Sequence, residues 1–293
     1  MNSRVQPLVW AMAGAALVSL GALGWLAREL LGNGSGRADA RPSLLDLLED
    51  VGRPGGGNRP VPPRRPAPPP PAPLRWSSPL AQACPASDPQ LSHRLSAALA
   101  NLPRLRQRVA IDPSNFGDRF RQDAFGNPVD PTPRVVVLHE TVYSLGSALN
   151  TFKTPHPRDE DQVSYHTLVG QRGEIVEVVP PEQRAFGAGN SAFNGQWVVT
   201  NPSVGGSINN FALHLSLESP ADGEDQEPQH SGYTGAQYDA AALVVADWMR
   251  RFRIPPQAIT THRHVDLGGE RADPRSFDWR ELETRLAALG MLC

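Results

Sequence analysis

The chain has 293 residues, a formal net charge of −2 and a sequence pI near 6.4. This near-neutral charge, with no long basic stripe outside a proline-rich stretch, gives no indication of nucleic-acid binding. The composition is uneven along the chain, so the first third looks mostly non-globular and the candidate domain lies in the remainder.

An uncharged apolar run, LVWAMAGAALVSLGALGWLA, occupies residues 8–27 and is long enough to cross a bilayer as a helix. A cleaved signal peptide would have a shorter apolar core and a cleavage site closer to it than Ala38-Asp39-Ala40. We therefore predict an uncleaved membrane anchor over residues 1–30. The flanking arginines do not decide its orientation.

Residues 31–84 form a predicted linker rich in proline and glycine, which favours an extended, semi-rigid spacer. A ligand for a proline-recognising domain is the alternative interpretation. Cys84 and Cys293 lie at the two ends of the part that looks folded. They either form a disulfide in an oxidising compartment or are two free thiols.

Helices and strands alternate after the linker. Residues 85–130 contain a lead-in helix, DPQLSHRLSAALANLPRLR, and a loop rich in Asp, Asn, Gly and Pro, both expected to pack on the next segment. Residues 131–293 form the main domain. Its predicted strands are RVVVLHE, VSYHTLVG, EIVEVVP, ALHLSLES and AITTH, and its predicted helices lie near 144–152, 235–252 and 278–289. This order predicts a single α/β domain with a central mixed β-sheet flanked by helices.

Two histidines follow buried-strand patterns. His139 ends the first strand of the domain and His262 ends the last one, while Asp273 follows in a loop. Two imidazoles and one carboxylate are a ligand set for a catalytic zinc ion, with a fourth position open to water. Structural histidines are the alternative, and the distance in sequence does not decide between the two.

Four motifs in order carry a family resemblance: VVVLHET, VSYHTLVGQRGEIVEVVP, AFGAGNSAFNG and THRHVDLGGERADPRSFDW. Together they resemble the zinc-dependent N-acetylmuramoyl-L-alanine amidases, a superfamily shared with phage amidase lysozymes and peptidoglycan recognition proteins. The resemblance covers roughly residues 134–280. It implies that His139, His262 and Asp273 bind Zn²⁺, and the presence of Asp273 favours an enzyme over a recognition module.

The resemblance also implies catalytic residues around the ion. Tyr165 matches a tyrosine beside the zinc-bound water, and Arg271 occupies a position where many members have a lysine. Arginine does not release a proton near neutral pH, so we expect electrostatic support from it. Where many members have a glutamate, this chain has Ser216, and Glu218 on the same strand face is a candidate general base. The alternative for Glu218 is a surface carboxylate at the end of a strand. Whether Tyr165 or Glu218 handles the proton stays open.

The AFGAGNSAFNG loop is the expected substrate-binding segment. Members often have a histidine where this chain has Gly187. Asn190, Ser191 and Asn194 remain as residues suited to hydrogen-bonding sugar or peptide amides, with turn formation as the plain alternative.

These expectations combine into one functional prediction. The chain is predicted to be a zinc-dependent peptidoglycan hydrolase that cleaves the amide between N-acetylmuramic acid and L-alanine of the stem peptide. The alternative is a non-catalytic peptidoglycan-binding module of the same fold. The expected location is the inner (cytoplasmic) membrane, crossed once, with the catalytic domain in the periplasm or cell-wall space.

Overall fold

The computed structural model describes residues 66–72, 76–86, 88–225 and 227–293. The predicted membrane anchor and most of the predicted linker lie outside these residues. Within the described ranges, none of the helices combines the length and the apolar character needed to span a membrane.

Six strands form the central sheet, in the order β1-β5-β4-β9-β3-β10. They are β1 (Arg106–Arg108), β5 (Ile175–Glu177), β4 (Thr167–Val169), β9 (Ala212–Leu217), β3 (Val135–Glu140) and β10 (Ile259–Thr261). Neighbouring strands are parallel except for the β4–β5 pair, so the sheet is mixed, as predicted. Two small antiparallel pairs lie outside this sheet: β2 (Phe116–Asp118) with β6 (Gln183–Ala185), and β7 (Val198–Asn201) with β8 (Gly205–Ser207).

The helices are α3 (Pro89–Ala100), α4 (Leu102–Leu105), α5 (Leu145–Lys153), α6 (Gly235–Phe252) and α7 (Trp279–Ala288). Short 3-10 helices lie at Pro79–Gln82 (η1), Pro113–Asn115 (η2), Asp159–Asp161 (η3), Ala221–Gly223 (η4), Pro256–Ala258 (η5) and His262–His264 (η6). The longest of these helices, α6, begins at a capping box in which the Thr234 and Gln237 side-chain oxygens each accept the other residue's backbone N–H.

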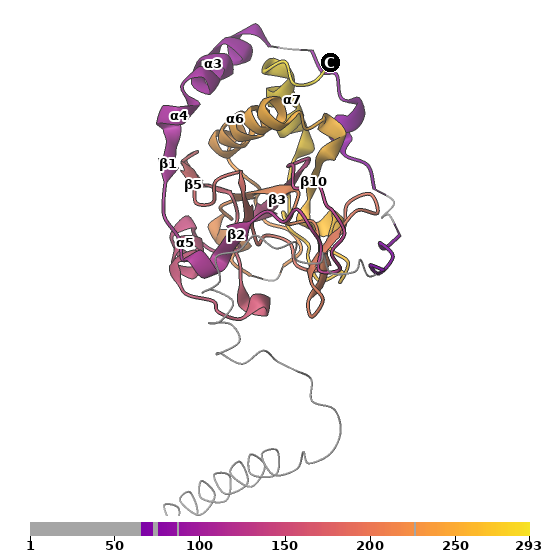
Figure 1. The fold of residues 1–293 in the computed structure, drawn as a ribbon. Coiled ribbons are helices and arrows are strands. Elements are labelled where there is room, and N and C mark those ends of the chain that lie inside the picture. Colours follow the sequence, from indigo (N-terminus) through magenta and orange to yellow (C-terminus); the bar gives the residue numbers. More distant parts are fainter. Residues whose placement is uncertain (1–65, 73–75, 87, 226) are drawn as a thin grey trace, which may run out of the picture. The chain divides into compact units, whose positions relative to one another are not determined.

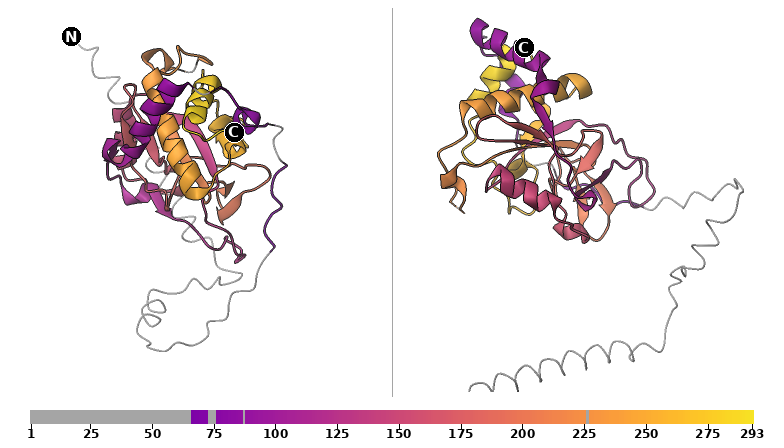
Figure 2. Two further views of the ribbon diagram at one scale, coloured as in Figure 1. Left: turned by 90° about the horizontal axis from the view of Figure 1, so that it is seen from above. Right: turned by 90° about the vertical axis from the view of Figure 1, so that its left-hand side faces the viewer.

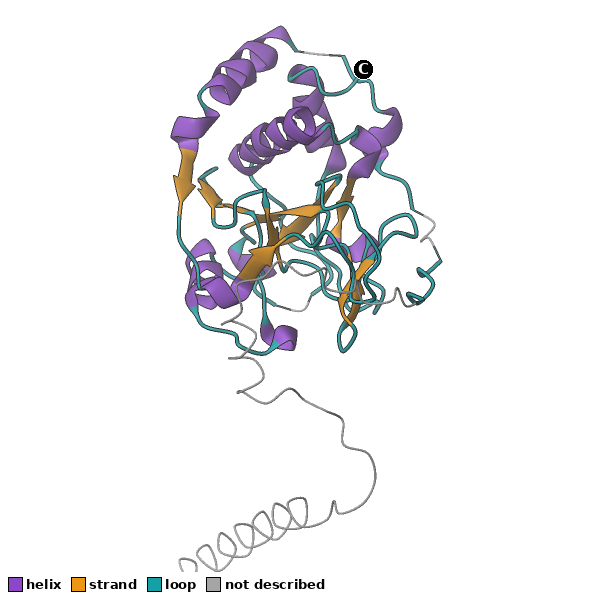
Figure 3. Cartoon of the chain, in the orientation of Figure 1, coloured by secondary structure: helices purple, strands orange, loops and turns teal. Residues whose placement is uncertain are grey.

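Helices cover both faces of the sheet. Figures 1 and 2 show α3, α6 and α7 on one face and α5 on the other, with the strands between them in Figure 3. The core on the α6 face contains Val136 and Leu138 of β3, whereas Val135 and Val137 belong to a core on the opposite face. This alternation follows from the two-residue period of a strand, and it directs His139 toward the α5 face.

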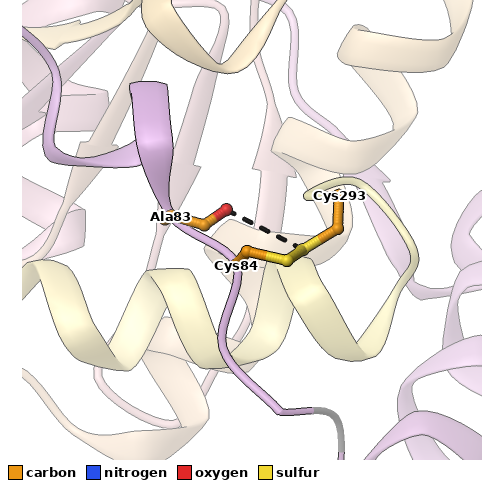
Figure 4. Close-up of a disulfide and its surroundings, with 3 residues drawn as sticks. All are labelled: Ala83, Cys84 and Cys293. Carbon is orange, nitrogen blue, oxygen red and sulfur yellow. Dashed lines mark hydrogen bonds between the residues drawn. A yellow bond between two sulfur atoms is a disulfide. The ribbon is translucent and has the colours of Figure 1, made fainter.

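A disulfide joins Cys84 to Cys293 and so links the two ends of the domain (Figure 4). Of the two alternatives for these cysteines, the structure therefore contains the disulfide and not two free thiols. Just before Cys84, η1 places Leu80 in the core, where it is 1% exposed. The predicted linker ended at residue 84, but the folded part starts earlier, because residues 76–84 pack on the domain through Leu80 and the disulfide.

Candidate metal centre

His139 and His262 lie at the ends of two adjacent parallel strands. In the register of β3 and β10, Leu138 pairs with Thr261, so the residues that follow them are neighbours at the carboxyl edge of the sheet. Their ring centroids are 4.6 Å apart and both side chains are buried. The sheet therefore brings together the two histidines that the sequence pointed to.

Asp273 completes the group from a loop after η6. Its Oδ2 lies 3.2 Å from Nδ1 of His139, and its Oδ1 lies 2.9 Å from Nδ1 of His262. The loop is held close because the backbone N–H of Arg263 donates to the carbonyl of Asp273 at 3.0 Å. One potential ligand atom from each of the three residues lies within 4.8 Å of the others.

The site holds His139 and Asp273 in the protonation states that a metal requires. Burial lowers the pKa of His139 to about 4, so its imidazole is neutral at physiological pH. Burial alone would raise the pKa of Asp273, but hydrogen bonds from His139 and His262 outweigh it and lower that pKa well below its usual range. The site thus offers an ionised carboxylate and a neutral imidazole.

The donor set and its geometry fit zinc. Tetrahedral ligands at roughly 2.0–2.1 Å from an ion are about 3.3 Å from one another. The separations of 2.9 and 3.2 Å between the carboxylate oxygens and the two Nδ1 atoms approach this value. His139, His262 and Asp273, the three residues that the sequence pointed to, would therefore hold the ion.

A cavity of about 580 Å³ opens beside these residues. His262 and Asp273 line it together with Tyr165 and Arg271, the two predicted catalytic residues. The ring centroid of Tyr165 lies 4.4 Å from that of His139. Burial, and next the charge of Asp273, raise the pKa of Tyr165, so its phenol keeps its proton and can donate it in a hydrogen bond.

Glu218, the alternative general base, does not line the cavity beside the metal ligands. Its Oε1 accepts the backbone N–H of Leu145 and its Oε2 accepts that of Gln171, both at 2.8 Å. β9 ends at Leu217, so Glu218 turns away from the strand face and ties α5 to the β4–β5 turn. We therefore withdraw it as the base.

The predicted substrate-binding residues separate into three roles. Asn190 is exposed and lines a second cavity. Ser191 is fully buried, and its hydroxyl donates to the carbonyl of Gly189 and accepts from Ile208 N–H, both at 3.1 Å, so it stabilises the loop itself. Asn194 has a φ of 48° in a tight turn between Phe193 and Gln196, which is the turn role named as its alternative.

The second cavity, of about 470 Å³, shares Glu160, Gln162, Phe186 and Gly189 with the first as wall residues. Arg184 lies in its wall with its guanidinium over the rings of Phe120 and Phe186, at 4.5 and 4.9 Å from their centroids. The β7–β8 hairpin contributes other wall residues, Val204 and Thr200 among them. The two cavities thus adjoin along one wall.

Two features near the ligands were not predicted. Glu140, beside His139, is buried and pairs with Arg275 from the loop that carries Asp273. His214 of β9 is also buried, and its Nδ1 lies 2.9 Å from Nε2 of His139. His214 lies on the same face of β9 as Ser216, and the cross-strand register that brings it to His139 has no signal in the sequence.

Comparisons with known proteins agree with the motifs. A family model described as N-acetylmuramoyl-L-alanine amidase matches residues 129–276. The chain is 30% identical over 173 residues to the 1,6-anhydro-N-acetylmuramyl-L-alanine amidase AmpD of Citrobacter freundii, covering 58% of this chain and 73% of that protein. It is 26% identical over 161 residues to the N-acetylmuramoyl-L-alanine amidase AmiD of Escherichia coli, covering 52% of each. A crystal structure of an AmpD derivative is 24% identical, with a TM-score of 0.45, and covers 61% of this chain and 93% of that one.

Proposed function

The chain belongs to the N-acetylmuramoyl-L-alanine amidase family, and from this premise we propose that it hydrolyses the amide between N-acetylmuramic acid and L-alanine in peptidoglycan. The observation that carries the proposal is the convergence of His139, His262 and Asp273, of which His262 and Asp273 line an open cavity. A complete ligand set beside a substrate-sized cavity favours an enzyme over a module that only binds peptidoglycan.

Zinc bound by two imidazoles and a carboxylate would lower the pKa of a bound water to about 7, which would make a nucleophile available at neutral pH. The chain's own part is to hold the scissile amide against this site and to stabilise the charge that develops on its carbonyl oxygen. The cavity wall offers two groups for that charge, the phenol of Tyr165 and the guanidinium of Arg271.

We assign Tyr165 the role of a hydrogen-bond donor to the carbonyl oxygen, since its raised pKa keeps the phenol protonated. Arg271 lies on the exposed side of the cavity and adds a positive charge that does not titrate near neutral pH. At the strand position next to His139, the chain has Ser216, which offers no carboxylate to act as a base. Tyr165 is therefore the better candidate of the two that the sequence left open.

The two adjoining cavities support a substrate that extends past the scissile bond. An amide that lies at the metal site has a sugar on one side and a peptide on the other. We propose that one of these parts occupies the second cavity, where Asn190 and Thr200 offer polar groups beside the exposed ring of Phe120.

The proposed location is the outer side of the cytoplasmic membrane, with residues 8–27 as the anchor. The Cys84–Cys293 disulfide supports it, because such bonds persist in exported proteins and are rare in the reducing cytosol. A proline-rich spacer at about 3.1 Å per residue would let the domain reach peptidoglycan away from the bilayer.

The proposal is tested with the full-length protein, purified muropeptides and zinc. Stem peptides should be released, and a chelator or His139→Ala should stop the release. Zinc-loaded protein that binds sacculi but releases no peptide would contradict amidase activity and support the alternative of a non-catalytic peptidoglycan-binding module. For the location, a fusion of a reporter to the C-terminus should be active only outside the cytoplasm, and a cytoplasmic signal would refute export.

A further inference from the structure

His214 lies directly behind the metal ligand His139. In the β3–β9 register, His214 pairs with Val137 and His139 pairs with Ser216, so both imidazoles project from the same face of the sheet. Nδ1 of His214 lies 2.9 Å from Nε2 of His139, whose other nitrogen, Nδ1, faces Asp273. The ring of His139 is thus placed between the metal position and a second, fully buried imidazole.

The protein holds His214 in place from two sides. The backbone N–H of His214 donates to Nδ1 of His166 at 3.0 Å, and the N–H of His166 donates to the carbonyl of His214 at 2.9 Å. On the other side, a Cβ atom at Gly187 would lie 2.5 Å from Cγ and Nδ1 of His214. Position 187 is therefore a glycine because the imidazole of His214 fills the space that any other side chain would enter.

Metal binding would fix the protons on this pair of rings. A neutral imidazole carries one proton, and a metal on Nδ1 of His139 forces that proton onto Nε2. The N–H then points at Nδ1 of His214, which must accept, so the proton of His214 is on its own Nε2. That nitrogen is buried and has no hydrogen-bond partner among the described residues.

We propose that His214 is a positioning residue for the metal site: its Nδ1 accepts the Nε2 proton of His139 and so presents the Nδ1 lone pair of His139 to the ion. Gly187 contributes to this positioning, because the absence of a Cβ atom leaves room for the ring of His214 beside His139. The inference rests on the proposed function only in that an ion binds at Nδ1 of His139. An unsatisfied Nε2 in the core would be costly without such a role.

The first test measures zinc affinity by competition with a chelator, independently of amidase activity. His214→Leu removes the acceptor and should raise the Kd for zinc about 10- to 100-fold. His214→Asn keeps an acceptor oxygen near the position of Nδ1 and should recover most of the affinity. Thr167→Val is the control, because it removes a buried, unpartnered hydroxyl on the neighbouring strand β4. Equal affinity in His214→Leu and the unmodified protein would overturn the proposal.

The second test uses two glycines of one loop. Gly187→Ala forces a Cβ against the ring of His214 and should weaken zinc binding, whereas a Cβ at Gly189 meets nothing within 4 Å, so Gly189→Ala should leave the affinity unchanged. These two glycine variants leave every polar core residue in place, so they test the positioning role of His214 even if His214→Leu does not fold. Unchanged zinc affinity in folded Gly187→Ala would count against the role of the contact.

The third test needs no substitution. Nitrogen-15 shifts of the imidazoles in the zinc-loaded protein should show both His139 and His214 protonated at Nε2, with Nδ1 of His214 unprotonated. A proton on Nδ1 of His214 would overturn the proposal. If the unmodified protein binds no zinc, this proposal and the proposed function both fail. If it binds zinc with an affinity that substitutions of His214 and Gly187 do not change, only this proposal fails.

Discussion

Glu140 and Arg275 form a buried ion pair that joins the strand of one metal ligand to the loop of another. Nε of Arg275 donates to Oε1 of Glu140, and the side chains of Tyr233 and His230 lie within hydrogen-bond distance of Oε2, at 2.6 and 3.1 Å. Glu140 follows His139 in β3, and Arg275 follows shortly after Asp273. The pair therefore holds the loop of Asp273 against the edge of the sheet.

Glu140→Gln should destabilise the protein and loosen the metal site together. Removing one charge of this buried pair leaves the guanidinium of Arg275 with only the more distant carboxylate of Asp225, at 3.7 Å, and breaking such a pair costs about 3–5 kcal/mol of unfolding free energy. Urea unfolding of the metal-free protein measures this loss, and chelator competition should show weaker zinc binding. The exposed pair of Arg158 and Asp161 supplies the control, since Asp161→Asn should change the stability by less than about 1 kcal/mol. A stable Glu140→Gln protein with full zinc affinity would refute the bracing role.

Tyr165→Phe should lower kcat and leave zinc affinity unchanged. The substitution keeps the ring beside His139 and removes only the hydroxyl that we assign to the carbonyl oxygen. Loss of one such donor lowers kcat by about 10²- to 10³-fold. The measurement is peptide release under saturating muropeptide, with zinc content determined on the same sample. Activity within twofold of the unmodified protein would exclude Tyr165 from the reaction.

Glu218→Gln tests the second candidate for the residue that handles the proton, which we expect to be structural. The carboxylate accepts backbone N–H groups of Leu145 and Gln171, so replacing one oxygen by an amide leaves one donor unpaired and should cost about 1–3 kcal/mol of stability. We expect a lower Tm and a kcat within twofold when both proteins are assayed well below their Tm. A large loss of kcat with an unchanged Tm would restore Glu218 as a catalytic group.

Segments with a clear apolar pattern could be predicted well from this sequence, and strands without one could not. The helix expected over 235–252 is α6, and the strand RVVVLHE is β3, because each has a strong apolar period and α6 has a capping residue at Thr234. The strands β2, β7 and β8 contain three or four residues each and lie where no strand was predicted. Their pairing depends on distant partners, which a local pattern does not contain.

The candidate site likewise contains residues whose place could be predicted from the sequence and residues whose place could not. His139, His262 and Asp273 could be predicted because strand ends and motifs identify them, and the structure brings them together. Glu218 was only one of two candidate bases, since strand parity would place it on the face of Ser216, but β9 ends at Leu217. The contact of His214 with His139 depends on cross-strand register, which is a property of the folded sheet.

Acid should destabilise the metal-free protein as pH falls from about 6.5 toward 4. Burial lowers the pKa of His139 to about 4, and burial also lowers the pKa values of His166 and His214. A histidine with a lowered folded-state pKa contributes stability that is complete above its unfolded value and is lost as pH falls through the folded pKa. His139 alone accounts for roughly 3 kcal/mol across this window. Thermal melts in the presence of chelator should show the loss, and a Tm that is flat from pH 7 to 4.5 would contradict it.

Reduction of the Cys84–Cys293 disulfide should lower the stability of the domain without removing its active site. The bond closes a loop between residues 209 apart in sequence, and cross-links of this kind contribute about 2–5 kcal/mol, mainly by restricting the unfolded chain. It also keeps the segment with Leu80 on the core. The double variant Cys84→Ser with Cys293→Ser should show a lower denaturant midpoint that no longer responds to reductant. Zinc affinity should stay unchanged, because neither cysteine belongs to the ligand group or lines the cavity beside it. Equal midpoints for the oxidised and reduced protein would show that the two ends are held by packing alone.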